Sequence, residues 1–108
     1  MKVSELISKS GFTPVSLPDD TRDITGVYIG DLLSWVMGRA SENDAWITIM
    51  SNINIVAVAS LTDVSCIILA EGVSLSEDII KTAESKGINI LSSELDAYDI
   101  AVTLHNLI

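Results

Sequence analysis

Three short apolar runs, each followed by a polar turn, constrain the fold of this 108-residue chain most strongly. They span Trp46–Met50, Cys66–Ala70 and Ile88–Leu91. Short apolar runs bounded by turn residues are typical of buried strands. Parallel neighbours need crossover connections, which are usually helices and right-handed. The sequence therefore predicts an α/β fold with three layers, α/β/α, a mainly parallel sheet and a single domain over residues 1–108.

Segments of helical length separate and follow these runs. Residues 52–61 alternate as in a strand, but their position requires a crossover, so we assign them to a helix. Ser74 and Glu77 stand at capping-box spacing, and Gly87 marks the end of that helix. Ser93 is the expected cap of the last helix. The residues expected to face the core from these two helices are Ile79, Ile80, Ala83, Ile100, Leu104, Leu107 and Ile108.

The first part of the chain predicts smaller elements. A short helix begins at Ser4 and stops at Gly11. Residues 12–17 are predicted as a strand, which Pro14 restricts to an edge of the sheet. Residues 23–30 form either a second short strand or an extended loop.

Composition limits the classes of partner. Fifteen acidic and six basic residues give a net charge of −9, which disfavours nucleic acid and anionic membrane surfaces. Apolar residues make up 48% of the chain and aromatic residues 5%, so the core must be aliphatic. Cys66, the single cysteine, lies in an apolar run and is expected to be a buried packing residue. No signal peptide or membrane-spanning run is evident, so we expect a cytoplasmic protein.

The segment after Gly30 predicts a self-association surface. Asp31 is placed to cap a short helix over residues 32–37. Apolar residues occupy most of the circumference of this helix, whereas a surface helix shows a single apolar stripe. In so small a domain the expected cover is a second copy of the chain. The predicted dimer-interface residues are Leu32, Leu33, Trp35, Val36 and Met37.

Polar turns follow the predicted parallel strands and meet at one edge of the sheet. Open parallel sheets bind ligands outside the carboxyl ends of their strands. The candidate ligand-binding residues in these turns are Ser51, Asn52, Asn54, Glu71, Gly72 and Ser92. The alternative is that the polar residues here only cap helices, as Asn52, Asn54, Ser74 and Ser93 would at any helix N-terminus.

No catalytic constellation is present in the sequence. Glu71 is the candidate carboxylate for acid–base catalysis in the predicted crevice, and no partner can be assigned to it. His105 is the single histidine and has no cysteine cluster beside it, which disfavours a transition-metal site. Residues 26–31 lack the Gly-Lys-Ser/Thr pattern of a phosphate loop. We therefore expect a protein that is not an enzyme and has no cofactor.

The chain resembles a known family. Residues 30–37, 46–59 and 67–72 together look like a DRTGG domain, and the resemblance runs from about Phe12 onward. It is similar to the small stand-alone DRTGG proteins of anaerobic bacteria. Related domains are attached to some phosphate acetyltransferases and, between cystathionine-β-synthase-type modules, to regulated inorganic pyrophosphatases. The signature turns correspond to residues 51–54, without an Asp-Arg pair, and to residues 70–72, with Gly72 retained.

The resemblance implies a fold similar to the N-terminal domain of HPr kinase/phosphorylase and a regulatory domain that tends to dimerise. Kinase chemistry in that enzyme belongs to a separate phosphate-loop domain. Stand-alone members are often encoded near iron-only hydrogenase and histidine-kinase-like components, which implies such proteins as partners. The resemblance thus predicts a non-catalytic regulatory and dimerisation module. The alternative is a sensor that binds a small ligand, an adenine nucleotide, at the carboxyl edge of the sheet.

Overall fold

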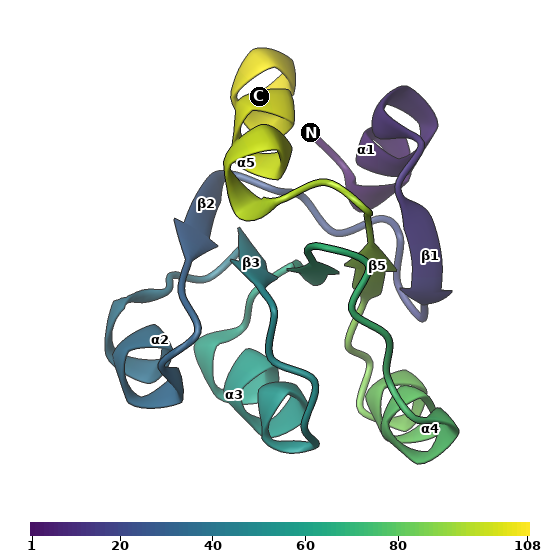
Figure 1. The fold of residues 1–108 in the computed structure, drawn as a ribbon, viewed down its shortest axis with the longest axis vertical. Coiled ribbons are helices and arrows are strands. Elements are labelled where there is room, and N and C mark those ends of the chain that lie inside the picture. Colours follow the sequence, from purple (N-terminus) through teal and green to yellow (C-terminus); the bar gives the residue numbers. More distant parts are fainter.

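The computed structural model describes residues 1–108 as a five-stranded sheet with helices on both faces (Figure 1). The strand order is β1-β5-β4-β3-β2, with β2, β3, β4 and β5 parallel and β1 antiparallel to β5. The strands are β1 (Thr13–Ser16), β2 (Gly26–Ile29), β3 (Asp44–Thr48), β4 (Cys66–Leu69) and β5 (Ile90–Ser92). The helices are α1 (Val3–Ser10), α2 (Leu33–Arg39), α3 (Asn54–Thr62), α4 (Glu77–Ser85) and α5 (Ala97–Leu107). The predicted three-layer α/β/α fold with a mainly parallel sheet is confirmed.

Two apolar cores lie on opposite faces of the sheet. Helices α1 and α5 cover one face, and α2, α3 and α4 cover the other (Figure 1). Successive residues of a strand point to opposite faces, so Ile47 packs below α5 whereas Trp46 packs against α2 and α3. Every residue of β3 and β4 is buried. Burial on both faces explains why these strands appear in the sequence as continuous apolar runs rather than alternating ones.

The first central strand starts two residues earlier than predicted. β3 begins at Asp44 rather than Trp46 and ends at Thr48 rather than Met50. Asp44 is buried, and its carboxylate accepts a hydrogen bond from the Ser41 amide at 2.7 Å. This bond satisfies an acidic side chain at the start of the strand, where the sequence alone suggests a turn.

The other strand and helix assignments agree with the structure to within about three residues. Residues 54–62 are helical, as the crossover argument requires, and residues 26–29 are a strand rather than a loop. The edge position predicted from Pro14 is confirmed, because β1 pairs with β5 alone. Cys66 is fully buried, and burial raises the pKa of its thiol to about 12.

Three predicted helix caps are wrong. Ser76, not Ser74, precedes α4, and Asp96, not Ser93, precedes α5, where its carboxylate accepts from the Asp99 amide at 2.8 Å. Asp31 caps no helix. Its carboxylate instead accepts from the Thr48 hydroxyl at 2.9 Å and the Ile49 amide at 3.1 Å, so it ties the start of α2 to the end of β3. Ile108 is also misassigned, since it is half exposed rather than part of the core.

Polar side chains join the loops at the amino end of the sheet. Asn89 is buried, and its amide nitrogen donates to the Asp19 and Ser65 carbonyls, while its oxygen accepts from the Asp19 amide. The Arg22 guanidinium donates to the Asp63 carboxylate at 2.9 Å and to the Asn43 side chain at 3.0 Å. These bonds fix the long loop before β2 against the rest of the sheet.

Candidate functional site

Helix α2 presents an apolar surface to solvent. Leu32, Trp35 and Met37 are 60%, 53% and 51% exposed. The Arg39 guanidinium lies 3.8 Å from the centre of the Trp35 ring, and this cation–π contact fixes one side of the indole. We call Leu32, Trp35 and Met37 the α2 patch.

The structure separates the predicted interface residues into buried and exposed ones. Val36 is fully buried and packs in the core of its own chain with Trp46 and Ile55, so it has no surface to offer a partner. Leu33 is half-buried against the same core. A helix that is apolar almost all round thus rests one side on its own sheet and leaves the other exposed.

The predicted ligand residues do not converge on one site. Gly72 and Ser92 line a pocket of about 280 Å³ at the carboxyl edge of β4 and β5, together with residues of β1 and the loop before α4. Ser51, Asn52, Asn54 and Glu71 are exposed and do not line it. The carboxyl edge of the sheet therefore carries a pocket, but over β4 and β5 rather than over β3.

Backbone amides in these turns already have acceptors. The Gly72 amide donates to the Ser93 carbonyl at 2.9 Å, and the Glu71 amide donates to the Leu95 carbonyl at 2.8 Å. The Asn54 amide donates to the Asn52 side chain at 2.9 Å, in the local turn that asparagine favours. These amides hold the turns together and are not free to bind an anion.

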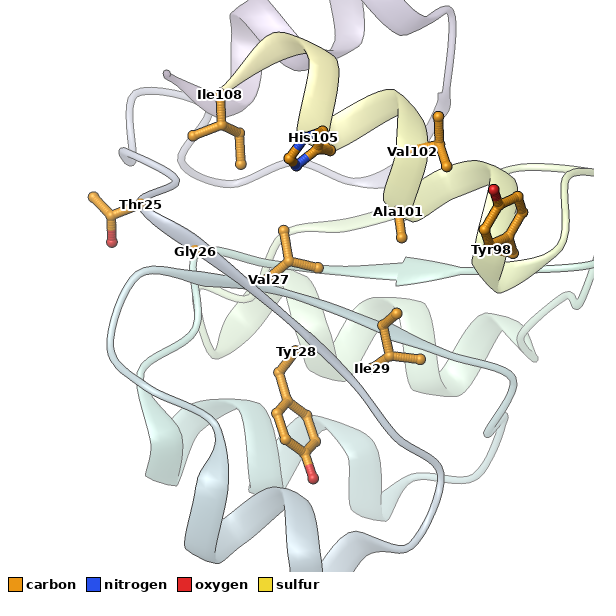
Figure 2. A pocket seen from close by; sticks show the side chains of 10 residues that line it. All are labelled: Thr25, Gly26, Val27, Tyr28, Ile29, Tyr98, Ala101, Val102, His105 and Ile108. Atoms are coloured by element: carbon orange, nitrogen blue, oxygen red, sulfur yellow. The ribbon is translucent and has the colours of Figure 1, made fainter.

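A larger pocket, which the sequence did not reveal, lies between β2 and α5. It has a volume of about 700 Å³ and is mostly apolar (Figure 2). Val27 and Ile29 point into it from β2, and Tyr98, Val102 and His105 line it from α5. The available signal was the spacing of Tyr98, Val102 and His105, which places a second stripe on α5 beside the buried Ile100 and Leu104 stripe.

The family model described as the DRTGG domain matches residues 15–107. The chain belongs to the DRTGG domain family. The resemblance inferred from the sequence is thus confirmed. No curated protein matches the sequence of this DRTGG domain.

A solved structure shares the fold of this DRTGG domain. It holds the CBS and DRTGG domains of the regulatory region of Clostridium perfringens pyrophosphatase, complexed with the activator diadenosine tetraphosphate. The TM-score is 0.76 and the sequence identity is 16%, over 94% of this chain and 45% of that chain. The chain thus spans less than half of that neighbour, and at this identity the likeness shows the fold.

Two further features of the structure bear on the site. No three histidine, cysteine, aspartate or glutamate side chains come together in a way that could hold a metal ion. None of the helices combines the length and the apolar character needed to cross a bilayer.

Proposed function

We propose that this DRTGG domain is a non-catalytic regulatory module that acts as a homodimer and works through protein partners. The α2 patch is the observation that supports this function most directly. Three large apolar side chains on a short helix and the residue before it, each at least half exposed, are typical of a surface that another protein covers. A second copy of the chain brings the same patch to the contact, as two-fold dimers do.

Static light scattering tests the dimer. A homodimer with a Kd of about 1 μM has a binding free energy of about −8.2 kcal/mol and is mostly assembled at tens of micromolar. We expect twice the mass of one chain at that concentration, falling toward the mass of one chain on dilution. The mass of a single chain throughout would contradict the proposal.

A second candidate function is a sensor that binds an adenine nucleotide in the pocket lined by Gly72 and Ser92. Support comes from its place at the carboxyl edge of parallel strands and from the hydroxyl-bearing residues Thr13, Ser74 and Ser92 in its lining. The structural neighbour was solved with diadenosine tetraphosphate, an adenine nucleotide.

A thermal-shift panel of adenine nucleotides tests this second function. A ligand at about 100 times its Kd adds roughly 2.7 kcal/mol to the free energy of unfolding. A rise in Tm with one nucleotide, saturating with concentration, is the expected result. Unchanged unfolding with every nucleotide at millimolar concentration would exclude the sensor.

A further inference from the structure

The two edges of the sheet differ in how they are protected against pairing with another strand. β1 carries Pro14, and its register with β5 shifts between Pro14 and Ser16. Prolines and irregular register are the usual means by which proteins block an edge. β2 has the sequence Gly-Val-Tyr-Ile, with no proline and no charge, and pairs with β3 in an unbroken register. The β2 edge is therefore open to strand addition.

The hydrogen bonding of β2 shows which of its backbone groups face outward. The Gly30 amide donates to the Ile47 carbonyl of β3 at 3.2 Å. Alternate residues of a parallel strand bond to the same neighbour, so Tyr28 also bonds toward β3. The amide and carbonyl groups of Val27 and Ile29 consequently point away from the sheet.

Exposed apolar side chains border this edge on both faces. The pocket of about 700 Å³ lies along β2 on the α5 side, where Val27 and Ile29 face α5 (Figure 2). Tyr28 points the opposite way, toward the face that α2 covers. Of the twelve large apolar side chains that are exposed, seven lie on β2, or within or next to the two helices α2 and α5 on its two faces: Ile29, Leu32, Trp35, Met37, Tyr98, Val102 and Ile108.

The area and the charge of this side match a second copy of the chain. A large side chain that is half exposed presents on the order of 100 Å², so seven present roughly 700 Å², close to the ~800 Å² per partner in a standard interface. In residues 26–39 and 97–107 the charged side chains are Asp31, Arg39 and Asp99. Although the chain carries a net charge of −9, two copies meeting here bring few like charges together.

We propose that β2 pairs antiparallel with β2 of a second copy, so that one sheet continues across the dimer. This pairing rests on the proposed homodimer and specifies its contact. A two-fold axis through Tyr28 places Val27 opposite Ile29 of the partner copy, and the outward amides and carbonyls of both residues then bond to each other. The exposed side chains of α5 meet their counterparts on one face, and those of α2 meet on the other.

Amide hydrogen exchange on the unmodified protein is the first test. The Val27 and Ile29 amides have no acceptor in one copy, so they should exchange fast in the monomer. Pairing should slow both at least roughly tenfold at concentrations where the dimer dominates, and dilution should restore fast exchange. Slow exchange of the Val27 and Ile29 amides in the monomer would overturn the pairing, because something other than a second copy would then protect the β2 edge.

Disulfide cross-linking is the second test. At the two-fold axis Tyr28 faces itself in a non-hydrogen-bonded pair, whose Cα separation of about 4.5 Å suits a disulfide. Tyr28→Cys should therefore cross-link two copies on mild oxidation. The unmodified protein is the control, since its cysteine, Cys66, is buried. The Trp35→Cys variant reports a dimer that forms through α2 alone.

The outcomes separate this contact from the dimer itself. Cross-linking at position 28 with slow exchange at Val27 and Ile29 supports the pairing. A dimer by light scattering that cross-links at position 35 alone, with both amides exchanging fast, overturns the pairing and leaves the homodimer standing. A single-chain mass by light scattering overturns both.

Discussion

Replacing Trp35 with glutamate perturbs the α2 patch with little effect on the fold of one chain. The indole is 53% exposed, and its one specific contact is the cation–π interaction with Arg39. Such exposed contacts contribute about 0.5–1 kcal/mol. We therefore expect Tm, measured where the protein is monomeric, to fall by only a few degrees.

The same change acts strongly on a dimer. Two-fold symmetry brings one new carboxylate from each copy into the contact, and a buried, unpaired charge costs about 3–5 kcal/mol. A loss of at least about 3 kcal/mol weakens Kd more than 100-fold. Light scattering at tens of micromolar should then give the mass of one chain.

Leu61→Glu is the matched control for Trp35→Glu. Leu61 is 75% exposed and lies on α3 in a shallow pocket beside α4, away from the α2 patch. Leu61→Glu introduces the same charge outside the proposed interface, so the Kd of the dimer should be unchanged. A Trp35→Glu protein that stays dimeric, or a Leu61→Glu protein that dissociates, would refute the assignment of the interface to α2.

Three further predictions concern stability and reactivity. Asp31→Ala removes the acceptor for Thr48 and Ile49 and should lower the free energy of unfolding by about 1–3 kcal/mol in urea titrations. Asn89→Ala removes three hydrogen bonds between the loops at the amino end of the sheet and should cost about 3 kcal/mol in the same assay, with an unchanged m-value. Cys66 should resist iodoacetamide until the chain unfolds. Burial raises the pKa of this thiol from 9.0 to about 12, so above pH 9 the unfolded chain loses the proton while the folded chain keeps it. The free energy of unfolding should therefore fall by about 1.4 kcal/mol per pH unit above pH 9, and Cys66→Ala should abolish this loss.

The sheet could be predicted because the information lies in short segments. Ile67 and Ile68, for example, lie in a run in which every residue is apolar, and such a run is typical of a strand buried on both faces. The helical crossover over residues 54–62 followed from connectivity rather than from its own pattern, since Ile55 and Ala57 alternate as in a strand. Chain topology therefore decided what local propensity left open.

The caps and the pockets depend on contacts between distant residues. Asp31 has the right residue type for a cap, but its carboxylate reaches Thr48, seventeen positions away. Near α5, Ser93 and Asp96 are both suitable caps, and only the path of the chain selects Asp96. The pocket between β2 and α5 requires knowing that β2 is an edge strand and that α5 returns to cover it, which no local pattern contains.

Gly72 allows the second candidate function to be tested apart from the first. Its φ of +69° lies in the left-handed region, and a Cβ added there would lie 2.5 Å from the Glu94 carboxylate. Gly72→Ala should therefore cost about 1–2 kcal/mol of stability and displace the Glu94 side chain, which lines the same pocket as Gly72. Gly87→Ala is the control, because Gly87 has a φ of +75° with nothing within 4 Å of its added Cβ.

If a nucleotide binds in this pocket, the thermal shift should be lost in Gly72→Ala and kept in Gly87→Ala. Both proteins should still be dimeric, because the pocket lies apart from α2 and the β2 edge. An equal shift in both variants would place the ligand elsewhere.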